Sequence, residues 1–245
     1  MPTRPITSLA GAHAAIVGDL LMPRPPAPRL TRGQWRIKRL MDVAGSLGML
    51  IFTAPVMILT AIVVSLTSSG PAIVGETRVG ACGKEFCCYK FRTTRMDAAS
   101  KITLIGRLLQ ATHIDELPQL FNVLAGEMSL IGPQPEWRHL AKLYRERFPS
   151  YELRFAAKPG IMGLAQLDCP EPTVPEMKLH YDLKYIFNYS LSMDIKILLR
   201  TILTAVWQNQ IATPAVPAED LPDSPQIKGE DLPRRRVELT QAPLA

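Results

Sequence analysis

Aromatic residues are scarce in this chain, at only 7% of 245 positions, and nowhere do basic and aromatic side chains alternate along a strip. Proteins that bind single-stranded nucleic acids stack the bases on aromatic side chains inside a basic groove. The sequence therefore gives little support to nucleic-acid binding, although its formal net charge is +6. Residues 1–75 carry seven Lys or Arg against two Asp. That local excess fits attraction to anionic lipid headgroups better.

Cysteine is also rare. The four cysteines are Cys82, Cys87, Cys88 and Cys169, and their spacing matches no zinc-binding pattern. We expect them to be free thiols in a reducing cytosol.

Charge is missing altogether from Val43 to Gly75, and the apolar centre of this stretch is Leu47–Leu66. About 20 helical residues suffice to cross a ~30 Å hydrocarbon core. Pro55 lies near the middle, where it removes a helical hydrogen bond and favours a kink. Both flanks are basic, whereas a spanning helix normally has its Lys and Arg excess on one side. Two basic flanks favour a re-entrant helix that bends at Pro55 and returns to the cytoplasmic face; the alternative is an ordinary kinked spanning helix.

The rest of the chain divides by composition. We expect a disordered, proline-rich arm at 1–33, a basic segment with the membrane helix at 34–75, a soluble domain at 76–211 and a disordered tail at 212–245. Short strands are predicted at 72–78 and 85–92. Helices are predicted at 102–110, 115–124, 135–147, 177–187 and 192–206. The fold class is therefore α+β and mostly α, with a minor β element.

Two adjacent carboxylates, Asp115 and Glu116, precede Pro118 at the expected start of a helix. Helix N-termini stabilise anions, because free N–H groups and the helix dipole lie there. An ionised Asp can act as a nucleophile, and a neighbouring carboxylate can hold Mg²⁺. An acidic first turn is also a common helix cap. The dipeptide alone therefore fits either reading.

Three further segments could bind phosphate. Lys90 and Arg92 alternate, so on a strand they would share a face and could grip phosphates or simply face solvent. Residues 132–135, Gly-Pro-Gln-Pro, form a rigid loop that suits either a ligand wall or a plain helix start. Lys158 precedes Pro159 and Gly160, where a backbone could approach a phosphate closely.

The ordered set of these segments resembles one family. It comprises Lys38-Arg39-Leu40-Met41-Asp42, the apolar helix with Pro55, Tyr89–Thr93, Asp115–Val123, Gly126–Pro135, Lys158–Ile161 and Gly163–Gln166. The order of these segments and the residues in them are similar to those of the bacterial sugar transferases, the monotopic polyprenyl-phosphate phosphoglycosyl transferases. The resemblance covers roughly residues 34–206.

The resemblance implies a reaction. Family members transfer a sugar-1-phosphate from a UDP-sugar to a polyprenyl phosphate such as undecaprenyl phosphate, release UMP and so initiate exopolysaccharide or other surface glycan synthesis. Asp115 would be the nucleophile that forms a covalent aspartyl phospho-sugar, and Glu116 would help hold Mg²⁺. The implied location is the inner membrane, with the catalytic domain on the cytoplasmic face.

The resemblance also assigns substrate-binding positions. These are Lys90, Arg92, Gln134, Arg154, Lys158 and Asp182. Family members usually carry Arg where this chain has Gln110 and Gln134, and often Ser where it has His113. Each lost Arg removes a cation suited to phosphate. The alternative to an active transferase is therefore a weakly active or inactive membrane scaffold that binds other glycosyltransferases.

Overall fold

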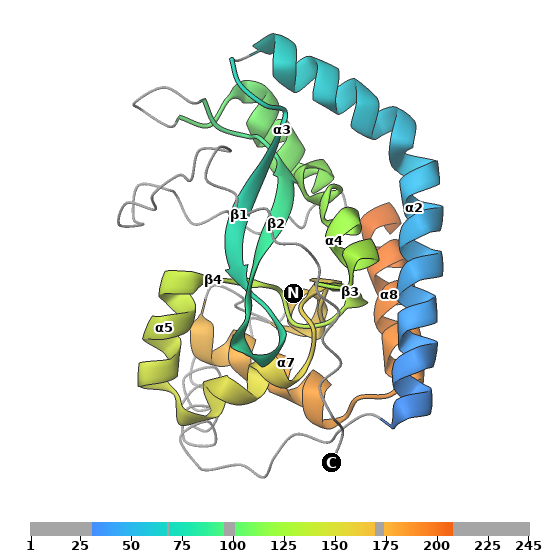
Figure 1. Ribbon diagram of the computed structural model, residues 1–245, viewed down its shortest axis with the longest axis vertical. Helices are drawn as coiled ribbons and strands as arrows, with labels where there is room; N and C mark the ends of the chain where they lie inside the picture. Colours follow the sequence, from blue (N-terminus) through green and yellow to red (C-terminus); the bar gives the residue numbers. More distant parts are fainter. Residues whose placement is uncertain (1–30, 68, 96–100, 170–173, 208–245) are drawn as a thin grey trace, which may run out of the picture. The chain divides into compact units, whose positions relative to one another are not determined.

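The computed structural model describes residues 31–67, 69–95, 101–169 and 174–207. These residues form a mostly helical structure with two small sheets and one long N-terminal helix (Figure 1). This agrees with the predicted α+β class. The proposed arm and tail lie almost entirely outside the described residues.

The long apolar segment is a single helix, α2 (Arg32–Thr67). Thr31 and Gln34 cap its start reciprocally, each backbone N–H donating to the other's side-chain oxygen. The helix continues through Pro55 without interruption, although its second half turns away from the line of the first (Figure 1). Proline removes one hydrogen bond and crowds the preceding turn, which bends a helix without having to end it. Among the described residues, α2 is the one helix long and apolar enough to cross a membrane, and 11% of its most apolar window is buried.

The larger sheet has three antiparallel strands in the order β2-β1-β4. Strands β1 (Ile73–Val79) and β2 (Glu85–Phe91) form a hairpin in which Val74 lies opposite Lys90. The connecting turn, residues 81–83, has positive φ at Cys82 and Gly83. Strand β4 (Glu136–Trp137) pairs with the end of β1. The expected helix at 135–147 therefore begins later, as α5 (Arg138–Arg147), because its first residues join the sheet.

The second sheet is a parallel pair, β3 (Ser129–Ile131) and β5 (Gly160–Met162). The chain around it approaches very closely: a Cβ on Gly160 would lie 2.1 Å from the backbone nitrogen of Gly132. Only glycine fits at such a crossing. The loops that flank this pair, 132–135 and 158–160, are thereby locked against each other.

Helices surround these sheets. They are α3 (Leu104–Ala111), α4 (Gln119–Ala125), α5, α6 (Leu164–Asp168), α7 (Pro175–Phe187) and α8 (Leu191–Trp207), with 3-10 turns at Ile114–Glu116 and Pro149–Ala156. The helix expected from 115 to 124 is thus split into a 3-10 turn and α4. Pro118 takes the N-cap position of α4, where its missing N–H is harmless.

Two hydrophobic clusters hold the structure together. The larger joins α4, β3, α7 and α8, with Leu120, Val123 and Leu183 at most 1% exposed. The smaller packs Met57 and Val64 of α2 against Phe91 and Leu109. The second half of α2 is therefore attached to the same body that its first half contacts.

Candidate functional site

A pocket of about 230 Å³ lies where the hairpin, the turn before α4 and the two glycine-containing loops meet. Its charged lining consists of Arg78, Lys90, Glu116, Glu136 and Lys178. The remaining lining includes Gln119, Gln134, Trp137 and Ile161. Three cations against two carboxylates make the wall suited to an anionic ligand.

The acidic pair lies in the 3-10 turn before α4, with Glu116 in the pocket lining and Asp115 next to it in the chain but outside that lining. His113, which has φ of 56° in the left-handed region, reverses the chain just ahead of it. Asp115 is buried at 7% exposure, whereas Glu116 is half-buried and lines the pocket. Burial raises the pKa of Asp115 to about 6, and Glu116 adds to this while Lys90 opposes it. The carboxylate is therefore mostly ionised at neutral pH and poorly solvated.

Lys90 is brought to the acidic pair. Its Nζ lies 3.2 Å from Glu116 Oε1. Burial acts to lower the pKa of Lys90, but Glu116 and Glu76 outweigh it and the pKa is raised. The lysine therefore stays charged.

Asn122 fixes the strand that carries Lys90. Its Oδ1 accepts from the N–H of Tyr89, and its Nδ2 donates to the carbonyl of Cys87. The amide thus pairs with the edge of β2 much as a neighbouring strand would. This contact sets the position of β2 relative to α4 and the turn that precedes it.

Arg92 does not join Lys90 at the pocket. Its guanidinium donates to the carbonyl oxygens of Ser69 and Val64, where α2 ends. The structure therefore places Lys90 in the pocket lining and Arg92 at the end of α2, so the two side chains do not share one surface. Strand β2 ends at Phe91, so strand alternation no longer governs Arg92. A cation at a helix C-terminus is favourable to the dipole and to the unpaired carbonyls.

Arg154 and Asp182 form a buried ion pair outside the lining of this pocket. Arg154 Nε lies 2.7 Å from Asp182 Oδ2, and the two residues are 4% and 1% exposed. The same guanidinium donates to the carbonyl of Gln134. Both residues therefore support the loop from behind, while the Gln134 side chain itself lines the pocket.

Lys158 also lies apart from the pocket lining. Its Nζ donates to the carbonyl of Gly126, at the C-cap of α4, and is 4.8 Å from the centre of the Trp35 ring. Arg39 donates to Val123 and Leu124 carbonyls of the same helix end. Burial, with Arg39 adding to it, lowers the pKa of Lys158.

Several pocket residues were not singled out from the sequence. The guanidinium carbon of Arg78 is 3.5 Å from the centre of the Trp137 ring, and its Nη2 is 2.6 Å from Glu76 Oε2. Lys178 Nζ is 3.0 Å from Glu136 Oε2. The sequence predicts a helix at 135–147, which contains Trp137, and a strand at 72–78, which ends at Arg78. The pairing of β4 with β1 brings them together, and local sequence patterns carry no signal for that pairing.

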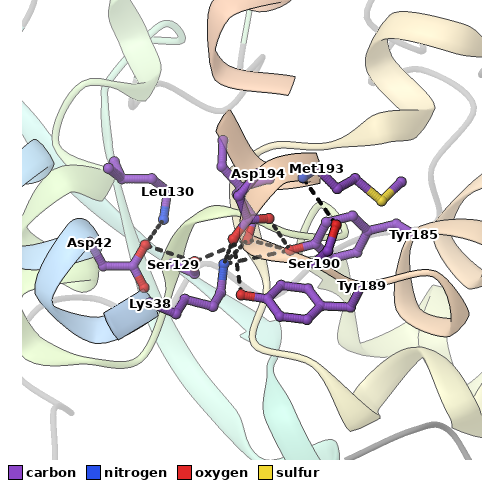
Figure 2. A network of polar contacts seen from close by, with 10 residues as sticks. Lys38, Asp42, Ser129, Leu130, Tyr185, Tyr189, Ser190, Met193 and Asp194 are labelled. Atoms are coloured by element: carbon purple, nitrogen blue, oxygen red, sulfur yellow. Dashed lines mark hydrogen bonds and ion pairs between the residues drawn. The ribbon is translucent and has the colours of Figure 1, made fainter. Parts of the chain in front are cut away.

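A polar network ties the first turns of α2 to β3, the strand that pairs with β5 (Figure 2). Asp42 Oδ1 accepts from the Leu130 N–H and the Ser129 hydroxyl, each at 2.9 Å. Lys38 Nζ donates to the Ile131 carbonyl at 3.0 Å and to Asp194 Oδ2 at 2.7 Å. Lys38 and Asp42 are one turn apart on α2 and therefore lie on the same face of the helix. Both bond to β3, along the edge of that strand that does not pair with β5. The loop 132–135 leaves the strand directly after this contact.

The carboxylates at the pocket bear on whether it can bind Mg²⁺. No group of three or more His, Cys, Asp or Glu side chains in the described ranges could hold a metal ion. Mg²⁺ commonly binds through one or two carboxylates together with substrate phosphates and water. Glu116 at the pocket wall, with Asp115 beside it, fits such a partial set.

Comparison of the sequence with known proteins finds a family match and several relatives. Residues 33–208 match the family described as "Bacterial sugar transferase". The UDP-glucose:undecaprenyl-phosphate glucose-1-phosphate transferase of Caulobacter vibrioides is 39% identical over 198 residues, which are 74% of this chain and 73% of the relative. The exopolysaccharide production protein PSS of Rhizobium leguminosarum bv. phaseoli is 36% identical over 69% of this chain and 94% of its own length.

A further relative is longer than the region it shares with this chain. The UDP-N-acetylgalactosamine-undecaprenyl-phosphate N-acetylgalactosaminephosphotransferase of Aeromonas hydrophila is 36% identical over 69% of this chain but only 43% of its own length. The family match, at residues 33–208, covers nearly all of α2 and every residue that lines the pocket, so the chain belongs to the bacterial sugar transferase family.

Proposed function

We propose that this protein transfers a sugar-1-phosphate from a UDP-sugar to a polyprenyl phosphate, such as undecaprenyl phosphate, at the start of surface polysaccharide synthesis. The observation that carries the proposal is the buried Asp115 beside a cation-lined pocket, within a family whose relatives are named for this activity. The pocket is lined by charges suited to a diphosphate.

In the proposed reaction, a carboxylate oxygen of Asp115 attacks the sugar-side phosphorus of the donor. A new O–P bond forms, the bond from that phosphorus to the bridging oxygen breaks, and its electron pair leaves on UMP. A phosphate oxygen of the polyprenyl phosphate then attacks the same phosphorus. This step frees the Asp115 carboxylate and produces a polyprenyl-diphosphate sugar. Splitting the transfer into two displacements is the usual gain from covalent catalysis.

The surroundings of Asp115 support this role. Poor solvation raises the free energy of the carboxylate, so less hydration has to be removed before it attacks. Lys90 acts in the opposite direction and keeps the group ionised at neutral pH. Arg78 and Lys178 would attract the donor's phosphates. Glu116, paired with Lys90, is the residue that would hold Mg²⁺, and a bound Mg²⁺ would offset the negative charge of the diphosphate.

We further propose that α2 is re-entrant, with the catalytic domain on the cytoplasmic face of the inner membrane. Lys38 near its start and Val64 near its end contact the same domain. A helix that spanned the bilayer would place its ends on opposite faces, so these contacts favour a helix that enters and returns. Single cysteines introduced near both ends should react with an impermeant thiol reagent from the same side. Labelling from opposite sides would rule the arrangement out.

The reaction is tested by UMP release from the purified full-length protein with polyprenyl phosphate, Mg²⁺ and a panel of UDP-sugars. Release with at least one donor, abolished in Asp115→Asn, is expected. Turnover by Asp115→Asn at the wild-type rate would remove Asp115 as the nucleophile. No release by the wild type with any donor would favour the scaffold hypothesis instead.

A further inference from the structure

Gln119, the first residue of α4, is nearly buried yet has no partner for its side chain. It is 3% exposed and it lines the pocket. Within the described ranges, no hydrogen bond links its amide group to another protein group. Its amide atoms are not among the fully buried polar atoms that lack a partner, so they keep some exposure to the pocket. A polar group in so nearly buried a side chain is normally hydrogen-bonded, so its partner is expected inside the pocket.

Asn122, one turn further along the same helix, shows that the packing of α4 can satisfy an amide. Its oxygen accepts from Tyr89, and its nitrogen donates to the Cys87 carbonyl and to Glu127. Gln119 differs in that its side chain reaches the pocket. The missing partner is therefore expected to come from the pocket's occupant.

The surroundings indicate the chemistry of that partner. Gln119 follows Glu116 by three residues, so it lies about one helical turn from the acidic pair. It shares the pocket wall with Lys90, Arg78 and Lys178, whose charges favour anionic oxygen. An amide N–H can donate to such an oxygen without carrying a charge. A cation at this position would instead compete with Lys90 for Glu116.

We propose that Gln119 is a catalytic residue that donates a hydrogen bond from Nε2 to a non-bridging oxygen of the phosphoryl group that Asp115 attacks. The assignment rests on the proposed function and deepens it. A fixed neutral donor at this oxygen stabilises the charge redistributed there during the displacement, as the donors of an oxyanion hole do. The donor is already in place on a helix, so little reorganisation accompanies the reaction.

The test uses full-length protein with Gln119→Leu, which removes the amide at similar volume, and Gln119→Glu, which replaces the donor with a negative charge. The first half-reaction is measured alone, as UMP release without polyprenyl phosphate. We expect Gln119→Leu to lower the rate at saturating donor by roughly 10²- to 10³-fold, the usual effect of losing one such donor. The KM for the donor should change much less. Gln119→Glu should be at least as impaired.

A matched control is Gln34→Leu. The Gln34 amide oxygen accepts from Thr31 at the start of α2, and the residue does not line the pocket. This variant should keep the wild-type rate. Thermal unfolding provides a second readout, because Gln119→Leu removes an unpaired buried amide and should unfold at the same temperature as the wild type or higher.

Three outcomes would overturn the assignment. One is an unchanged rate in Gln119→Leu. Another is a loss of rate matched by a loss of thermal stability, which would make the residue structural. The third is a loss that depends on which sugar the donor carries, which would place the contact on the sugar instead. If the wild type itself releases no UMP, the proposed function fails first, and the assignment fails with it.

Discussion

Replacing Lys90 by Gln should shift the pH dependence of the first half-reaction. Lys90 is the main group that lowers the pKa of Asp115 against the effect of burial, and it holds Glu116 at 3.2 Å. At an effective dielectric constant of about 20, Coulomb's law gives about 4 kcal/mol for two unit charges 4 Å apart, and proportionately less at a larger separation. One pKa unit corresponds to about 1.4 kcal/mol. Removing the cation should therefore raise the pKa of Asp115 by roughly one to two units.

The assay is single-turnover UMP release at saturating donor, without polyprenyl phosphate, between pH 5 and 9. The donor diphosphate stays ionised over this range, so the acid limb reports enzyme groups. In the wild type the limb should have its midpoint near the Asp115 pKa of about 6. In Lys90→Gln the midpoint of the acid limb should lie near pH 7 or above. The rates of the variant and the wild type should converge again at high pH.

Lys90→Arg is the matched control, because it keeps a cation beside Glu116. Its acid limb should stay close to that of the wild type. An unmoved limb in Lys90→Gln would refute the reasoning, since it would show that the titrating group does not interact with Lys90.

Two further predictions concern stability. Because burial holds the folded-state pKa of Asp115 near 6, above its ordinary value of 3.8, the ionised form destabilises the folded protein above pH 6 by roughly 3 kcal/mol. Asp115→Asn should therefore raise the unfolding midpoint at pH 8, and this gain should vanish as the pH falls through 6 towards 4; an equal gain at both pH values would contradict the burial argument. Asp42→Ala leaves the buried Leu130 N–H without its acceptor, while the Ser129 hydroxyl can still donate to the Ile131 carbonyl, and the change should cost roughly 1–3 kcal/mol in chemical unfolding. Asp42→Asn, which keeps one acceptor oxygen, should lower the free energy of unfolding clearly less. Equal losses in the two variants would show that the hydrogen bonds of Asp42 to β3 do not stabilise the fold.

The elements that depend on local pattern could be predicted. The hairpin strands, the long apolar helix and the closing helices α7 and α8 lie within a few residues of their expected positions. Their signals are hydrophobic periodicity and glycine turns, which act over short distances. The Asp115–Glu116 turn and its neighbour Lys90 were also identified, and the structure brings Lys90 and Glu116 together.

The parts that depend on long-range pairing could not be predicted. Trp137 joins a strand with β1 although its own segment reads as helical. Arg154 and Asp182, which the resemblance assigns to substrate binding, form a buried ion pair with each other. Arg92 lies at the end of α2 because the strand that carries Lys90 has already ended. In each case the partner is distant in sequence, and residue type alone does not identify it.

The most direct test of the account is to find the covalent intermediate. Full-length protein would be incubated with its UDP-sugar and Mg²⁺ without polyprenyl phosphate, then digested and analysed by mass spectrometry. The account predicts a phospho-sugar adduct on the peptide that contains Asp115, formed together with one UMP per enzyme, lost on adding polyprenyl phosphate and absent from Asp115→Asn. UMP release without any adduct, or an adduct on another residue, would contradict it.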